Sequence, residues 1–143
     1  MTDDSGALQD ALAAQHATIW AYGEIGAAVG DDHLAAVDAA DAANRARRQG
    51  LEDIVRSLGQ EPVASLPGYQ LPAPVTDDVS ALTLAASLED AMAAQWRHCT
   101  GRVSTASVRT FCIDALTETT IAALRWRQLA GSPALPPAFP GMS

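Results

Sequence analysis

The distribution of proline restricts the fold of this chain more than any other sequence feature. All eight prolines fall in two clusters, within residues 62–74 and 133–140. Because proline inside a helix removes a hydrogen bond and clashes with the preceding turn, long helices are confined to the two proline-free stretches, 1–61 and 75–132. Alanine, the strongest helix former, occupies 30 of the 143 positions. The chain is therefore expected to be all-helical.

Hydrophobic residues recur at helical spacing within each proline-free stretch, and no segment shows the alternation of a half-buried strand. In the first stretch, Gly30 followed by Asp31 is typical of a helix end and a new N-cap. A turn near Gly101 divides the second stretch in the same way. The predicted helices span about residues 5–29, 32–58, 78–100 and 104–130.

Two of the three connections between these helices are short and one is long. Short links make the helices of each pair antiparallel neighbours, whereas the segment 60–76 is long enough to run the length of a bundle. A four-helix bundle with one long crossover between its second and third helices is the ferritin-like arrangement. We therefore expect one ferritin-like domain over residues 1–143, ending in a proline-rich tail at 132–143. The crossover and tail are too apolar for disordered linkers and are expected to lie ordered along the bundle, with Leu66, Tyr69, Leu71, Val75, Leu135 and Phe139 as their apolar residues.

A pattern in the first predicted helix recurs in the third. Asp10-Ala-Leu-Ala-Ala-Gln15 returns as Asp90-Ala-Met-Ala-Ala-Gln95, at an offset of 80 residues. This repeat indicates that the two helical hairpins are copies of one unit. It also predicts that Gln95 occupies the position in the third helix that Gln15 occupies in the first.

A band of polar residues interrupts the apolar seams near the middle of the helices. Gln15 and Gln95 lie in the seams of the first and third helices, and Asp41, Asn44 and Arg48 follow one another at i, i+3 and i+7 in the second. We expect the two glutamines to hydrogen-bond to each other across the bundle. We expect Arg48 to neutralise Asp41, so that the band sets the register of the helices without a metal ion.

The same band is where a ferritin-like bundle would hold two metal ions. Such a site takes a Glu from each of two helices and a Glu-x-x-His pair from each of the other two. This chain has Gln15 and Gln95 in the first kind of position, and Asp38-x-x-Asp41 and Glu118 without a following His in the second. Neutral amides are weaker ligands than carboxylates, so a metal-free band is favoured. The alternative is a reduced metal site made of Asp38, Asp41 and Glu118 with the two glutamines.

Several segments of the chain form a recognisable pattern. They are Ala14-Gln15-His16-Ala17, Tyr22-Gly23, Arg45-Ala46-Arg47-Arg48, Tyr69-Gln70-Leu71-Pro72-Ala73-Pro74-Val75-Thr76-Asp77, Leu88-Glu89-Asp90 and Ala138-Phe139-Pro140-Gly141. In these segments the chain resembles a known family, the ferritin-like domain-of-unknown-function proteins of high-G+C actinobacteria. The resemblance implies the ferritin-like fold and no established activity. In the family pattern Glu often stands at the position of Gln15 and His at that of Asn44, so this chain departs where a metal would bind.

Charge and composition exclude some partners. A net charge of −8 repels phosphate backbones, so nucleic-acid binding is not expected. No apolar run approaches the roughly 18 residues that a membrane span needs. The N-terminal sequence Met1-Thr2-Asp3-Asp4 is acidic where a secretory signal is basic, which predicts a cytoplasmic protein.

The two cysteines are expected to be free, buried thiols. If the turn between the third and fourth helices centres near Arg102, Cys99 and Cys112 differ in height by about 10 Å. A disulfide requires Cα atoms within about 7 Å of each other.

These observations favour a binding or structural module over an enzyme. The sequence contains no phosphate-binding loop, and no cysteine or serine nucleophile is paired with a histidine at a suitable spacing. We expect no cofactor, a homodimer, and either a protein partner or a small ligand. The alternative is a metal-binding oxidoreductase or storage protein with the reduced carboxylate site. Three tryptophans are expected in the core or a dimer interface, with a ligand pocket as the other possibility: Trp20, Trp96 and Trp126.

Overall fold

Four long helices make up the part of the chain that the structure, a computed structural model, describes, residues 4–131. No strand occurs within these residues, so the prediction of an all-helical chain is confirmed for them. The helices are α1 (Asp4–Ala28), α2 (Asp31–Ser57), α3 (Asp78–Arg102) and α4 (Ala106–Leu129).

Local sequence accounts for where these helices begin and end. Gly59 has φ of +81°, the left-handed conformation that glycine adopts at the end of a helix, directly after α2. At the start of α3, the Asp77 carboxylate accepts a hydrogen bond from Ser80 N at 2.8 Å, and the Ser80 side chain caps Asp77 N in return. Between α3 and α4, Val103 and Thr105 have extended backbone conformations, so α4 begins only at Ala106.

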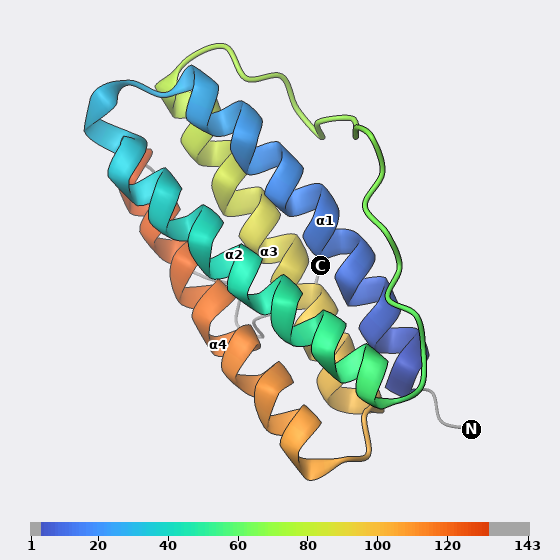
Figure 1. The fold of residues 1–143 in the computed structure, drawn as a ribbon. Helices are drawn as coiled ribbons and strands as arrows, with labels where there is room; N and C mark the ends of the chain where they lie inside the picture. The colour runs from blue at the N-terminus through green and yellow to red at the C-terminus, as the bar shows by residue number, and fades with distance from the viewer. Residues whose placement is uncertain (1–3, 132–143) are drawn as a thin grey trace.

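The chain forms two helical hairpins, α1 with α2 and α3 with α4 (Figure 1). The hairpins meet mainly through α1 and α3, which run antiparallel: Tyr22 contacts Glu89, and Ala7 contacts Cys99 near the other end. By contrast, α2 and α4 have few contacts along their length. The two hairpins are therefore joined on one side and separated on the other.

The long crossover between α2 and α3 runs along α1 (Figure 1). Gln9 fixes its first residues, because its amide donates to the Glu61 carbonyl at 2.7 Å and accepts from Val63 N at 2.8 Å. Further on, Tyr69 packs against Trp20 with ring centroids 6.1 Å apart. The crossover thus lies along the bundle, but Leu66 is 61% exposed and not packed against it. The matching prediction for the tail lies outside the described residues.

The core consists of two apolar clusters separated by a polar layer. One cluster lies at the end where α1 begins and α3 ends, and includes Leu12, Leu51 and Trp96. The other surrounds Tyr22, Leu82 and Trp126. Every helix has a buried polar side chain at the level between the clusters, and α2 has a second one in Arg47. The others are Gln15, Asn44, Glu89 and Thr119.

The buried faces of α1 and α3 match at a different offset from the one predicted. The first residues of α1 and α3 are Asp4 and Asp78, an offset of 74, and at that offset most of the buried residues of the two helices coincide. Gln15 corresponds to Glu89, not to Gln95. The sequence repeat at an offset of 80 is therefore not the structural correspondence between the helices.

One glycine explains where α2 and α4 approach each other. A Cβ atom on Gly50 would lie 2.6 Å from the Phe111 ring, so the absence of a side chain on α2 makes room for that ring from α4. Phe111 also packs edge-on against Trp96, with centroids 5.7 Å apart. Beyond this contact, toward the start of α2, the space between the two helices is open.

Candidate functional site: the central polar cluster and the adjoining groove

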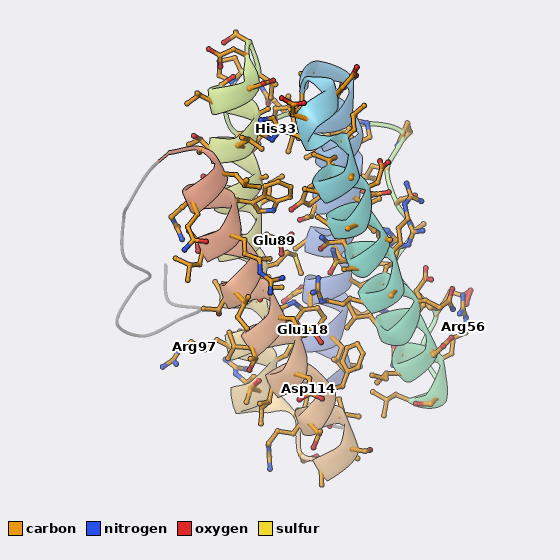
Figure 2. All side chains as sticks on the ribbon, turned by 90° about the vertical axis from the view of Figure 1, so that its left-hand side faces the viewer. His33, Arg56, Glu89, Arg97, Asp114 and Glu118 are labelled. Carbon is orange, nitrogen blue, oxygen red and sulfur yellow. The ribbon has the colours of Figure 1, made fainter. Side chains whose placement is uncertain are left out.

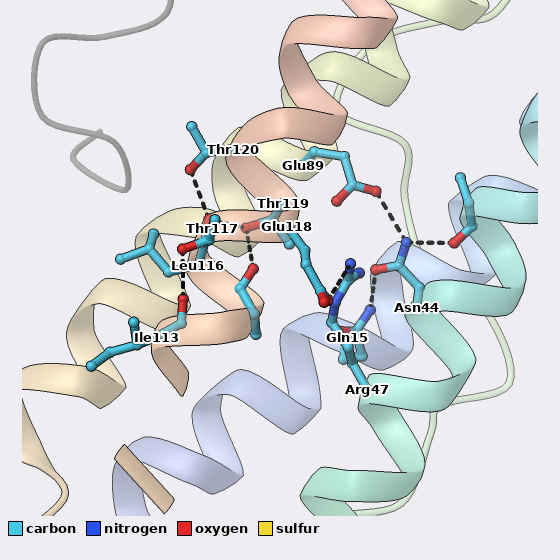
Figure 3. A network of polar contacts seen from close by, with 12 residues as sticks. Gln15, Asn44, Arg47, Glu89, Ile113, Leu116, Thr117, Glu118, Thr119 and Thr120 are labelled. Atoms are coloured by element: carbon cyan, nitrogen blue, oxygen red, sulfur yellow. Dashed lines mark hydrogen bonds and ion pairs between the residues drawn. The ribbon is translucent and has the colours of Figure 1, made fainter. Parts of the chain in front are cut away.

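A chain of hydrogen bonds joins three of the helices at the polar layer (Figure 3). The Gln15 amide donates to Asn44 Oδ1 at 2.6 Å. The Asn44 amide in turn donates to Glu89 Oε2 at 3.0 Å and to the Ala40 carbonyl at 2.9 Å. These side chains are at most 1% exposed, so their hydrogen bonds replace water that they lost on folding. Asn44 is thus the link between α1, α2 and α3.

Two aromatic side chains extend this chain to the fourth helix. The Trp126 indole N–H of α4 donates to the Tyr22 hydroxyl at 3.0 Å, and that hydroxyl donates to Glu89 Oε2 at 2.5 Å. The two rings are in tilted contact, with centroids 6.3 Å apart. Glu89 therefore receives two hydrogen bonds on one oxygen. We call Gln15, Tyr22, Asn44, Glu89 and Trp126 the central cluster.

The only carboxyl group of the central cluster is electrostatically perturbed. Burial raises the pKa of Glu89 above its usual value, while the hydrogen bonds from Tyr22 and Asn44 and the charge of Arg47 oppose that rise. Burial, then the neighbouring Glu89 charge, raises the pKa of Tyr22 well above its ordinary value. Tyr22 consequently keeps its proton and acts as a hydrogen-bond donor to Glu89.

Three buried atoms at this level have no hydrogen-bond partner among the described residues. Two are acceptors, Gln15 Oε1 and Glu89 Oε1, and one is a donor, Arg47 Nε. Buried polar atoms are costly when unpaired, and a bound water or ligand commonly satisfies them. The centre of the domain thus retains hydrogen-bonding capacity that the protein itself does not use.

Arg47 lies between the central cluster and an open groove. The residue is 9% exposed, and its Nη2 donates to Glu118 Oε1 of α4 at 3.4 Å. The Glu118 side chain is 62% exposed, so most of this carboxylate faces solvent. Figure 2 looks toward α2 and α4 and labels Glu118 between their ribbons. Arg47 is the one charged side chain that is buried and also lines the groove.

The groove itself separates α2 from α4 and has a volume of about 570 Å³. Its α2 wall consists of alanines, and its α4 wall carries larger apolar side chains, Trp126 among them. Volumes of 300 to about 1,000 Å³ with mostly apolar walls and a few polar groups are typical of small-molecule sites. The lining residues are Ala36, Ala39, Ala40, Ala43, Arg47, Glu118, Ile121, Ala122, Arg125, Trp126 and Leu129.

The structure brings together only part of the predicted polar band. Gln15 and Asn44 are buried partners, but no hydrogen bond joins Gln15 to Gln95 within residues 4–131. Gln95 is half-buried in a separate surface cleft beside Asp10 and His98, because it lies about one and a half turns from the position equivalent to Gln15. The expected glutamine pair is thus replaced by a pair of Gln15 with Asn44.

The expected pairing of Arg48 with Asp41 is also corrected. Asp41 binds Arg45, one turn further along α2, at 2.8 Å. Arg48 is half-buried in a cleft under the crossover, lined by His16 and Trp20 among others. The inward position on this face of α2 belongs instead to Arg47.

Sequence reasoning missed Glu89, Arg47 and the role of Tyr22 as a donor. A signal for Glu89 was present: Ala85, Glu89, Met92, Trp96 and Cys99 follow one another at spacings of four and three, so one acidic residue stands in an apolar stripe. The repeat at an offset of 80 predicted Gln95 at this place instead.

The residues at the centre do not fit a pair of metal ions. Among residues 4–131, no three His, Cys, Asp or Glu side chains are grouped so that they could hold one ion. Asp38 is exposed, Asp41 binds Arg45, and Glu118 binds Arg47. The central cluster supplies one carboxylate together with amides and hydrogen-bond donors, whereas a di-iron site requires several carboxylates and imidazoles.

Cys99 and Cys112 are both buried and free, as predicted, but they are neighbours. The neighbouring Cys112 thiol, and then burial, raises the pKa of Cys99, while the Cys99 thiol lowers the pKa of Cys112. Because α4 begins at Ala106, the turn is centred beyond Arg102, and the expected difference in height largely disappears. The predicted separation of the two cysteines along the bundle was therefore wrong, although both are free and buried as expected.

Fold and site together define a four-helix domain whose centre is a hydrogen-bonded polar cluster beside an apolar groove. Residues 7–143 match the family described as "Domain of unknown function (DUF4439)", and the chain belongs to this family. A solved structure of similar fold is that of a conserved hypothetical protein, rv2844, from Mycobacterium tuberculosis. It is 35% identical, with a TM-score of 0.86, over 88% of this chain and 96% of that one. Comparison with curated proteins finds no match.

None of the described helices combines the length and the apolar character that crossing a lipid bilayer requires.

Proposed function

We propose that this chain is a ferritin-like binding module whose bundle centre is a structural polar cluster instead of a di-metal site. The observation that carries the proposal is the donor set of the buried layer. Each helix contributes one side chain to it, Gln15, Asn44, Glu89 and Thr119, and only one of the four is a carboxylate.

The ferritin-like assignment is supported by the order of the helices. A long crossover joins α2 to α3, and the polar layer lies at mid-height, where bundles of that class hold metal ions. Polar side chains of all four helices lie inside the bundle, as in such a site, but amide and hydroxyl groups replace all but one of the acidic ones. A hydrogen-bonded network of this kind favours one packing of the helices over others, as buried polar groups do in coiled coils.

Binding, as opposed to catalysis, is supported by the groove between α2 and α4. Its walls are mostly apolar. Trp126 lines it and donates to Tyr22 of the central cluster, and Arg47 lines it and favours the ionised form of Glu89 through its charge. Gln15 and Glu89 each keep an unpaired oxygen in the buried layer, and these oxygens can accept hydrogen bonds from a ligand. Neither residue forms a nucleophile with an adjacent base.

The first test is the metal content of the purified chain after expression in medium supplemented with iron and manganese. We expect well under one equivalent of iron, manganese or zinc per chain and no ferroxidase activity. The Glu89→Gln variant is expected to have the same metal content as the wild type. Two tightly bound ions per chain would instead contradict the proposal, and their loss in Glu89→Gln would place them at the central cluster.

The second test is binding of an uncharged apolar dye, N-phenylnaphthylamine, followed by its fluorescence. Ala43→Phe places a ring in the groove from an exposed position of α2, whereas Ala42→Phe adds the same ring to a neighbouring exposed position that does not line it. We expect saturable dye binding that Ala43→Phe abolishes and Ala42→Phe leaves intact. Absence of binding, or equal binding by both variants, contradicts the proposed function.

The homodimer and the cytoplasmic location predicted from the sequence belong to the same proposal. Ile113 of α4 is 44% exposed and offers an apolar contact outside the groove, and free buried thiols suit a reducing compartment. Light scattering of the purified chain measures the oligomeric state directly.

A further inference from the structure

We propose that the groove between α2 and α4 binds a small amphipathic carboxylate, with its apolar chain along the alanines of α2 and its carboxylate on Arg47. This inference rests on the proposed function and adds the chemical class of the ligand.

The shape of the groove suits a slender apolar chain. From Ala36 to Arg47 the α2 wall is about 16 Å long at the helical rise of 1.5 Å per residue. The side chains facing the groove from this wall, before Arg47, are all methyl groups. Each methylene that leaves water for such a surface contributes about 0.8 kcal/mol, so affinity is expected to grow with chain length up to the length of the wall.

Arg47 provides the polar end of the site. It is nine-tenths buried, its Nε has no partner within the described residues, and its bond to Glu118 is long at 3.4 Å. No hydrogen bond joins Arg47 to Glu89 in the described part of the chain. Glu89 Oε2 accepts its hydrogen bonds from Tyr22 and Asn44 instead. A guanidinium group matches a carboxylate through two parallel hydrogen bonds, one of which requires a free Nε–H or Nη–H.

The charges around the groove select an anion. Arg47 and Arg125 line it together with one acidic residue, Glu118, so the lining is net positive in a chain of net charge −8. Glu118 is mostly in solvent, where its attraction to Arg47 is screened, and it can turn outward when another carboxylate arrives. A ligand with an ammonium head group would meet two arginines and is disfavoured.

The experiment measures displacement of N-phenylnaphthylamine by octanoate, octanol and octylammonium below their aggregation concentrations. We expect octanoate to compete about tenfold better than octanol, since a charge-assisted hydrogen bond to a buried arginine contributes that much. Octylammonium is expected to compete least. In Arg47→Gln we expect octanoate to compete with the dye no better than octanol, and octanol to compete as it does in the wild type.

Glu118→Gln keeps the proposal testable if the Arg47 variant fails to fold. This exposed substitution removes the carboxylate that competes for Arg47, so octanoate is expected to bind several times more tightly and octanol unchanged. Ala42→Phe serves as the control and should leave all three ligands as in the wild type.

Three outcomes overturn the inference. It is overturned if octanol matches octanoate in the wild type, or if Glu118→Gln leaves octanoate binding unchanged. It is also overturned if light scattering shows a dimer that Ala43→Phe dissociates, because a second copy of the chain would then be the occupant. Failure of the dye itself to bind is a different result, because it contradicts the proposed function and not only the class of ligand.

Discussion

Removing the hydroxyl group of Tyr22 perturbs two hydrogen bonds while leaving the aromatic ring in place. In Tyr22→Phe, Glu89 loses the donor at 2.5 Å, and the Trp126 indole N–H loses its acceptor at 3.0 Å. Both partners stay buried, so neither finds water in exchange. The substitution therefore tests whether the central cluster stabilises the fold.

The magnitude follows from the two bonds. A hydrogen bond to a charged group contributes about 1.5 to 3 kcal/mol, and an unpaired buried donor costs about 1 to 3 kcal/mol. Since the two bonds share one hydroxyl, we expect Tyr22→Phe to lower the free energy of unfolding by about 3 kcal/mol in total at neutral pH. This loss lowers the melting temperature by about 10 °C. Tyr69→Phe is the matched control, because the Tyr69 hydroxyl accepts one exposed bond from Leu66 N at 2.8 Å. We expect it to cost less than about 0.5 kcal/mol.

The cost of Tyr22→Phe is also expected to depend on pH. Burial already raises the folded-state pKa of Glu89, and the bond from Tyr22 opposes that rise, so its loss raises the pKa further. A carboxyl group whose pKa is raised by folding stabilises the folded state, and this stabilisation is complete below the pKa of the unfolded chain, about 4.3. The stabilisation is lost as the pH rises through the pKa of the folded state. Because the folded-state pKa of Glu89 is higher in the variant, the loss of stability relative to the wild type is greatest at alkaline pH and becomes smaller on acidification.

Urea unfolding of the wild type and both variants across the pH range measures these quantities. The reasoning is refuted if Tyr22→Phe costs no more than Tyr69→Phe, or if its cost stays constant as the pH falls through the titration of Glu89. A cost that grows on acidification would show that Tyr22 stabilises the protonated carboxyl and not the ionised one.

Two further predictions concern the glutamines and the thiols. Gln15→Leu should lower the free energy of unfolding by about 1 to 3 kcal/mol, because it leaves the buried Asn44 amide oxygen unpaired, and Gln95→Leu should lower it by less than about 0.5 kcal/mol. The two effects should add, because the residues are not partners; a coupling energy above about 0.5 kcal/mol in urea unfolding would restore the glutamine pair. Cys99 and Cys112 should react with a thiol reagent only after unfolding, because both side chains are fully buried; prompt labelling of either in the native protein would contradict their placement.

Helix positions could be predicted from the sequence because they depend on local signals. The proline clusters, Gly59 after α2 and the Asp77 cap before α3 act within a few residues of the helix ends they determine. Gln15 and Asn44 were found for the same reason, since each is a polar residue within an apolar seam. Their pairing with each other was not, because it depends on how α1 and α2 are rotated.

The other members of the site depend on contacts between distant segments. Arg47 and Arg48 differ by only 100° around α2, and the sequence favoured the wrong one because both fit an approximate stripe. The groove has no sequence signal at all, since its width is set where Phe111 meets Gly50 and by the scarcity of contacts between α2 and α4 elsewhere. Alanine-rich segments also gave the misleading repeat at an offset of 80, because similar short segments recur by chance in such a composition.

The central cluster has a consequence for the order in which the chain assembles. Each hairpin is built from contacts that are comparatively local, but the bonds of the cluster close separations of 45 residues from Asn44 to Glu89 and 104 residues from Tyr22 to Trp126. These bonds form only when one hairpin docks on the other, and loop closure over such distances is the slow part of folding. Circular dichroism therefore follows helix formation, whereas burial of the Trp126 indole reports the docking of the hairpins.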